Sequence, residues 1–211
     1  MSEEMQQHDL QDRLNLIETM IAEGRRSTES WGWVFVLWGV AYLVAIAWAS
    51  WGSTEPGWSL LNGRHSGIAW PVTMLSGAVL TLVIGLRRGR RKMGTMLGRA
   101  VTAVWAGIGI SMLVVFTPLG FSGRLDAHSF VALVAAMLGA ANAGSGLILR
   151  WKMQMGCAVV WWAAAAAACF GTAAQASMVF VAAVFICQIV FGVYAMVKES
   201  RRQQVHGEAH A

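Results

Sequence analysis

Charged residues are scarce in this chain of 211 residues. Lys, Arg, Asp and Glu together make up 13% of it, whereas 56% of its residues are hydrophobic. Soluble globular domains contain about 25% charged residues, and half that proportion does not cover the surface of a soluble protein of this size. The composition excludes a soluble enzyme, a nucleic-acid-binding domain and an intrinsically disordered chain, and it indicates a protein that resides in lipid.

Asp, Glu, Lys, Arg and His are absent from six long hydrophobic runs. Each run is near the roughly 20 residues that a helix needs to cross the hydrocarbon core of a bilayer. The sequence therefore predicts an all-α integral membrane protein, a bundle of six transmembrane helices. The predicted spans are residues 31–51, 68–86, 100–119, 130–149, 155–171 and 177–197.

The same absence limits the chemistry that these spans offer. Proton-coupled pumps, voltage sensors, retinal proteins and b-type haem proteins all use ionisable groups at membrane depth. The five histidines lie in tails, in loops or at one helix end, and the three cysteines lie inside apolar runs, where small buried hydrophobic roles are expected. We expect no catalytic residues, no cofactor and no metal site.

The basic residues separate strongly between the two sides of the predicted bundle. Of the 16 Lys and Arg residues, all fall on one side except Arg64 and Arg124. Under the positive-inside rule, this places both termini and two basic loops in the cytoplasm. The predicted organisation is a cytoplasmic amphipathic arm (1–30), a transmembrane domain (31–198) and a polar cytoplasmic tail (199–211).

The loop after the second span is the most basic segment of the chain. We expect it to contact the anionic headgroups of the bilayer or to dock the acidic N-terminal arm. The net charge of +5 is therefore attributed to topology rather than to nucleic-acid binding. The residues concerned are Arg87, Arg88, Arg90, Arg91 and Lys92.

The N-terminal arm carries a short apolar seam. Leu10, Leu14, Ile17 and Ile21 recur at spacings of four, three and four residues, which is typical of one face of a helix. The other faces are acidic, whereas a helix that lies in a membrane interface normally has a basic polar face. We expect the arm to contact protein, either the basic surface of its own chain or the same helix in a neighbouring subunit.

Two amides lie in the middle of apolar spans, Asn142 in the fourth and Gln188 in the sixth. An amide that faces lipid is unfavourable, so both are expected to face the bundle or a partner subunit. They predict an interhelical hydrogen bond or a polar pocket for a small neutral solute, and Ser111 is a candidate member of either arrangement.

Small residues give the fourth span a predicted packing face of Gly139, Ala143 and Gly144, which would let another helix approach closely. Asp126 precedes this span and is expected to cap it. The alanine run 163–168 predicts that the fifth span is central and closely packed.

Residues 21–39, with the sequence IAEGRRSTESWGWVFVLWG, resemble the opening of small uncharacterised multi-pass proteins of bacterial inner membranes. Those proteins begin with a short amphipathic helix, an Arg-rich junction and a first span that contains Trp-Gly. The resemblance covers about residues 10–40 and implies a bacterial inner-membrane location, but it implies no activity and no functional residues.

Two functions remain open at this stage. The first is a non-enzymatic membrane protein that acts through assembly, as a homo-oligomer or as an accessory subunit of a larger membrane complex. The alternative is a channel or carrier for a small neutral or hydrophobic solute, with Asn142 and Gln188 in its lining. A continuous file of polar side chains along the bundle would favour the second function, and a solid core of Ala and Gly would favour the first.

Overall fold

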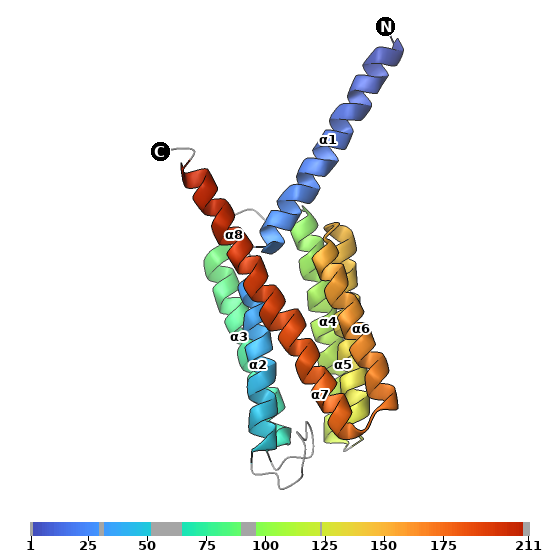
Figure 1. Cartoon of the computed structure of the whole chain (residues 1–211), viewed down its shortest axis with the longest axis vertical. Helices are drawn as coiled ribbons and strands as arrows, with labels where there is room; N and C mark the ends of the chain where they lie inside the picture. The colour runs from blue at the N-terminus through green and yellow to red at the C-terminus, as the bar shows by residue number, and fades with distance from the viewer. Residues whose placement is uncertain (1, 30–31, 52–64, 90–95, 123, 209–211) are drawn as a thin grey trace.

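In the computed structural model of the chain, residues 2–29, 32–51, 65–89, 96–122 and 124–208 are described, and the regular structure of these ranges is helical (Figure 1). One element, η1, is a π-helix, and the others are α-helices. The elements are α1 (Ser2–Glu29), α2 (Gly32–Ser50), α3 (Ser66–Gly89), α4 (Met96–Phe121), α5 (Ala127–Ile148), α6 (Lys152–Phe170), α7 (Ala173–Val184), η1 (Phe185–Val190) and α8 (Phe191–Glu208).

Within these ranges, six helices are long and apolar enough to cross a membrane. Five of them are α2 to α6. The sixth is the continuous helix formed by α7, η1 and α8, whose apolar part covers Ala173–Arg201. The prediction of six spans is confirmed at this level of length and composition.

The helix α7–η1–α8 runs obliquely through the bundle (Figure 1). It contacts α2, which pairs with α3, and through α7 and η1 it also contacts the group of α5 and α6. α5 packs against α4, α6 and α7, and it has more buried residues than any other single element of the described chain. The alanine-rich fifth span, α6, was expected to be central and closely packed. It is not central, because Ala163, Ala166 and Ala167 are exposed, although Ala164 and Ala168 of the same run are buried.

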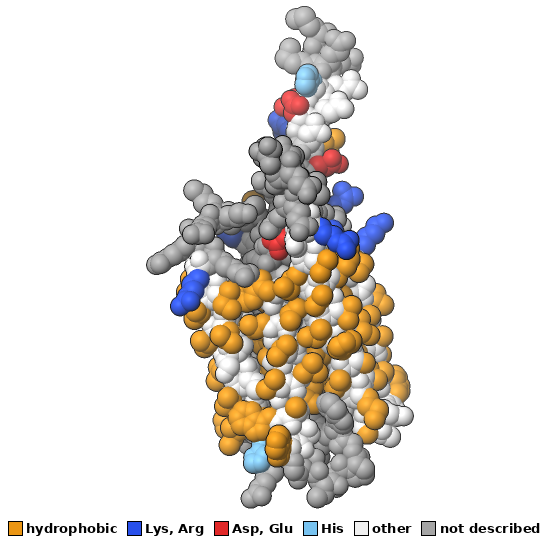
Figure 2. Space-filling view, turned by 60° about the vertical axis from the view of Figure 1, so that its left-hand side comes forward, with side chains coloured by type: hydrophobic (Ala, Val, Ile, Leu, Met, Phe, Trp, Pro, Cys, Tyr) orange, Lys and Arg blue, Asp and Glu red, His pale blue; other side chains and the backbone are white. Residues whose placement is uncertain are grey.

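The two ends of the bundle differ in charge. α1 and the last turns of α8 project from the same end (Figure 1). Figure 2 shows Lys and Arg side chains at this end and an apolar band over the middle of the molecule. Of the described basic side chains of the bundle, only Arg124 lies in the turn at the opposite end, and the others are Arg87, Arg99, Arg150, Lys152, Lys198 and Arg201.

Asp126 caps α5, as the sequence predicts. Its Oδ1 accepts hydrogen bonds from the backbone N–H groups of His128 at 2.9 Å and of Ser129 at 3.0 Å. Its Oδ2 accepts a third bond, at 2.6 Å, from the hydroxyl of Ser129. These bonds satisfy donors that the first turn of a helix otherwise leaves free.

The last span begins earlier than predicted, at Ala173 rather than near residue 177. Thr172 is the N-cap, and its Oγ1 accepts a hydrogen bond from the backbone N–H of Gln175 at 3.3 Å. In return, Oε1 of Gln175 accepts a bond from the backbone N–H of Thr172 at 2.8 Å. This reciprocal capping box starts the helix at Ala173, so the turn before the last span is shorter than predicted.

Candidate functional site

Six polar side chains are buried among the described residues, and three of them are hydroxyls. Thr73 and Ser177 donate to carbonyls of their own helices, at 2.6 and 2.9 Å. The hydroxyl of Ser145 accepts a hydrogen bond from the indole Nε1 of Trp105 at 3.0 Å. The other three buried polar side chains are the amides of Asn142, Gln154 and Gln188, with 1%, 0% and 2% of their surface exposed.

The three amides retain unused hydrogen-bonding capacity. Nδ2 of Asn142 donates to the carbonyl of Leu138 at 2.8 Å. Within the described chain, Oδ1 of Asn142, Oε1 of Gln188, both polar atoms of Gln154 and Nε1 of Trp161 are buried without a hydrogen-bond partner. Such an atom costs about 1–3 kcal/mol, and native proteins contain few of them. We call Asn142, Gln154, Trp161 and Gln188 the polar file.

The pairing of α5 with α6 shows which residues of α6 lie at the same depth in the bundle as Asn142. A Cβ atom on Gly146 would lie 3.0 Å from the backbone nitrogen of Met155, and one on Gly139 would meet the indole of Trp162. The two helices are therefore antiparallel neighbours with these residues opposite one another. Asn142 lies midway between the two glycines, so it stands about level with residues 158–159 of α6.

The file also follows one face of α6. Gln154 and Trp161 are seven residues apart, which is two helical turns and about 10 Å along the axis. Cys157 and Ala158 lie between them on the same buried face. The polar atoms of α6 thus extend from its first turn to the middle of the helix.

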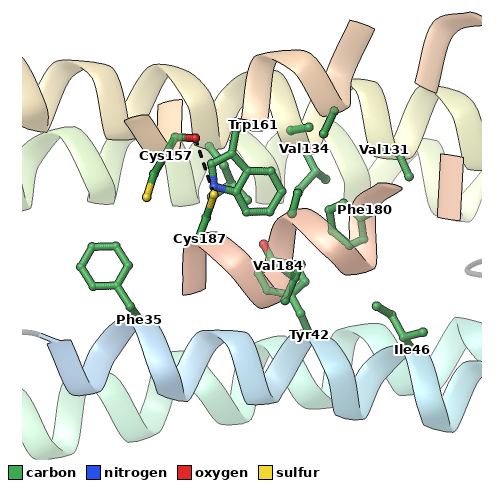
Figure 3. Close-up of a cluster of buried hydrophobic side chains, with 14 of the residues drawn as sticks. Phe35, Tyr42, Ile46, Val131, Val134, Cys157, Trp161, Phe180, Val184 and Cys187 are labelled. Atoms are coloured by element: carbon green, nitrogen blue, oxygen red, sulfur yellow. Dashed lines mark hydrogen bonds between the residues drawn. The ribbon is translucent and has the colours of Figure 1, made fainter. Parts of the chain in front are cut away.

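η1 contributes the last member of the file. Sγ of Cys187 donates to the carbonyl of Cys157 at 3.6 Å, which ties η1 to α6 beside Trp161 (Figure 3). The next residue, Gln188, lies against α2, because a Cβ atom on Gly39 would be 2.8 Å from Cβ of Gln188. π-helical turns occur frequently at functional sites.

Aromatic rings adjoin the end of the file at Trp161. The ring of Phe180 lies 6.0 Å from that of Trp161, 5.7 Å from Tyr42 and 5.9 Å from Phe130, measured between centroids. Trp70 lies 4.8 Å from Phe130. Figure 3 shows Phe180 to one side of Trp161 and Tyr42 below both rings. We call Tyr42, Trp70, Phe130 and Phe180 the aromatic cluster.

The polar residues predicted from sequence are brought together only in part. Asn142 and Gln188 both face protein rather than lipid. The bond of Asn142 is within its own helix, however, and its Oδ1 forms no interhelical bond with any described residue. Ser111 is exposed on α4, so it does not join the buried amides within one chain.

The predicted packing face divides between two neighbours. Gly139 is buried under the indole of Trp162 on α6, so a side chain rather than a second backbone approaches it. Gly144 faces α4, where a Cβ atom would lie 3.6 Å from Cγ1 of Val104. Ala143 is half-buried between these positions.

The arm extends from the bundle (Figure 1), and it touches α4 and α8. The side chains of residues 7–19 are exposed, including Leu10, Leu14 and Ile17, so this part of the seam does not dock on its own chain. The side chain of Ile21 lies outside the described residues. In the basic loop, Arg87 is exposed, whereas the side chain of Arg88 and residues Arg90, Arg91 and Lys92 lie outside the described part.

Sequence reasoning missed half of the polar file. Gln154 falls one residue before the predicted start of the fifth span, although α6 begins at Lys152 and buries this amide completely. The sequence did offer a signal for Gln154, because an amide lies within one turn of the end of a predicted span. Trp161 gave no such signal, because an indole in an apolar run also fits lipid contact.

The comparisons add no relative. No family model, no curated protein and no solved structure matches this chain.

Proposed function

We propose that this chain is a non-enzymatic multi-pass membrane protein that acts through assembly, by pairing α1 with α1 of a second copy. The exposed apolar seam carries the proposal: Leu10, Leu14 and Ile17 have 56%, 61% and 52% of their surface exposed. α1 has 28 residues and is therefore about 40 Å long. A seam of this kind on a helix that leaves the bundle needs a partner to remove it from water.

The energy of such pairing fits a tethered pair of helices. Complete burial of a Leu or Ile side chain contributes about 1.5–3 kcal/mol, but an isolated helix of two heptads is marginal in water. Copies that share a bilayer meet at a high effective concentration, which favours pairing without any further contact. The transmembrane domain thus supports an association that the free arm would not sustain.

The charges on α1 favour a second copy over other partners. With Leu10 and Ile17 at the d positions of a heptad and Leu14 at a, Arg13 takes position g and Glu18 takes position e. Copies inserted in the same orientation present their arms in parallel, so Arg13 of one arm lies opposite the partner's Glu18. Arg13 also pairs with Asp9 of its own helix at 3.0 Å, which holds its side chain along this edge.

The proposal includes an orientation and a location. The end that carries α1 and the cluster of basic side chains would face the cytoplasm, in line with the positive-inside rule, and the membrane would be a bacterial inner membrane. Arg87, Arg99 and Lys152 are exposed there and suit contact with anionic headgroups. The acidic side chains of α1 oppose its adsorption to the same surface and leave the seam free for protein.

Cysteine cross-linking in native membranes tests the pairing. In a chain whose native cysteines are replaced by alanine, Leu14→Cys is expected to form an interchain disulfide under mild oxidation. Thr19→Cys, on the opposite face of the same helix, is expected to cross-link at least five-fold less. Equal cross-linking at both positions, or none at Leu14→Cys, would contradict the proposal.

A charge exchange separates self-association from binding to another protein. Glu18→Arg places like charges opposite each other in a parallel pair and is expected to raise the dissociation constant of the dimer about ten-fold, since each exposed pair contributes about 0–1 kcal/mol. The double variant Arg13→Glu/Glu18→Arg restores opposite charges and most of the affinity. Native mass measurements in mild detergent read out both effects, and failure of the double variant to recover dimer would refute the parallel pairing.

A further inference from the structure

We infer that the polar file is a hydrated site inside the bundle that takes up water from the basic end of the molecule. The inference goes beyond the proposed assembly and does not depend on it. It rests on the buried polar atoms, on their neutral surroundings and on the aromatic cluster at one end.

The unpartnered atoms of the file form a mixed set of donors and acceptors. Oδ1 of Asn142, Oε1 of Gln154 and Oε1 of Gln188 are acceptors, and Nε2 of Gln154 and Nε1 of Trp161 are donors. A molecule that donates and accepts at once satisfies both kinds. Water does this with two to four partners, and buried water commonly joins polar groups of this type.

The surroundings exclude charged ligands. The buried polar residues of the described chain are amides and hydroxyls, without a carboxylate, an ammonium or a guanidinium group. An ion in such a core would have no opposite charge to offset its desolvation. The neighbours along the file are small or closely packed, with Ala158 and Ala164 at 0% and 3% exposure. The site therefore suits a neutral ligand of the size of water.

The two ends of the file differ in depth. Gln154 is the third residue of α6, next to the exposed Lys152 and Met153 at the basic end. At the other end, Phe180 and Tyr42 of the aromatic cluster close the core beyond Trp161, with ring contacts of 5.7–6.0 Å. Rings also pack at the basic end, where Trp151 lies 5.1 Å from Phe191. The inferred water path runs beside these rings to Gln154 and ends at Trp161.

η1 explains how the file acquires its amide from the sixth span. Cys187 and Gln188 are consecutive residues with 0% and 2% exposure, so this turn points two successive side chains into the core. Gly39 leaves room for Gln188 on the side of α2. The π-helical turn thereby directs Cys187 to α6 and its neighbour Gln188 to α2, and η1 packs against both helices.

Hydrogen exchange at a single indole tests the site. The full-length chain is labelled with ¹⁵N-tryptophan, placed in bilayer nanodiscs and transferred to D₂O, and the indole signal of Trp161 is assigned by its loss in Trp161→Phe. We expect this N–H to exchange at least 100-fold faster than the backbone N–H of buried Ala164, labelled separately. Exchange as slow as that of Ala164 would overturn the inference.

Matched variants locate the water path. Gln154→Leu is expected to slow exchange at Trp161 at least ten-fold, because it places an apolar group at the entrance, and Gln188→Leu serves as a second variant if the first does not fold. Ser177→Ala removes a buried hydroxyl outside the file and is expected to leave the rate unchanged. Phe180→Leu, at the closed end, is not expected to slow it. Equal slowing by Phe180→Leu, or no slowing by either amide variant, would refute the hydrated file.

Discussion

Polar residues inside these spans are accommodated according to the number of groups that each must satisfy. The hydroxyls of Thr73 and Ser177 reach a carbonyl four residues back on their own helices. Asn142 makes the same bond with its Nδ2, but its Oδ1 points elsewhere and stays unpartnered among the described residues. These two hydroxyls are thus satisfied within one helix, whereas an amide has a second group that needs another partner. This difference explains why the polar file consists of amides and one indole.

A prediction at this scale concerns Asp126. Three hydrogen bonds from the first turn of α5, above all that from the Ser129 hydroxyl, lower the pKa of this carboxyl below its usual value. Its stabilising contribution is therefore complete above the unfolded-state pKa and is lost as the pH falls through the lower folded-state value, below about pH 4.

The lowered pKa of Asp126 leads to two expected results. Asp126→Ala is expected to lower stability by about 1 kcal/mol at neutral pH. Asp126→Asn keeps an acceptor oxygen and removes the charge, so the Tm difference between wild type and this variant is expected to shrink below about pH 4. Thermal unfolding of both chains in one detergent measures this, and a constant difference down to pH 3 would count against the cap as the cause.

At the scale of the helix, the sequence identifies spans well and their inward faces poorly. A helix in lipid is apolar on all sides, so hydrophobic periodicity does not separate the face toward the core from the face toward the acyl chains. Ser111 was expected to join the buried amides for this reason, although it is exposed on α4. η1 was not predicted either, because residues 185–190 contain neither Gly nor Pro to mark a change of helix type.

The two glycines of the predicted packing face provide a matched prediction at this scale. At Gly139, an added methyl group would collide with the indole of Trp162, whereas at Gly144 it would make an ordinary contact with Val104. Gly144→Ala is expected to be neutral or slightly stabilising, since alanine favours a helix over glycine. Gly139→Ala is expected to be less stable than Gly144→Ala by about 1–3 kcal/mol, because Trp162 must move. Unfolding in the same detergent compares them, and equal stability would show that the indole yields at no cost.

At the scale of the whole molecule, the number of spans could be predicted because lipid tolerates few charges over a helix length. The ends of the spans were less accurate, since helices continue beyond the hydrocarbon core into the interface: α6 begins at Lys152, and this shift is what hid Gln154. The central place of α5 depends on which faces meet in three dimensions. Contacts between helix faces join residues that are far apart in the chain, so the pattern of any one span does not predict them.

The proposed orientation of the molecule leads to the last prediction. Ser122 and Ser200 are both exposed, Ser122 in the turn after α4 and Ser200 near the end of α8 at the basic end. In a chain with its native cysteines replaced by alanine, Ser122→Cys is expected to react with a membrane-impermeant maleimide on intact spheroplasts. Ser200→Cys is expected to react only after the membrane is opened, because the positive-inside rule places its side in the cytoplasm. Both variants exchange one exposed serine for cysteine and leave every Lys and Arg in place, so the basic charge that governs insertion is unchanged. The reverse labelling pattern would invert the orientation and place the seam of α1 in the periplasm, where it would have to pair outside the cell.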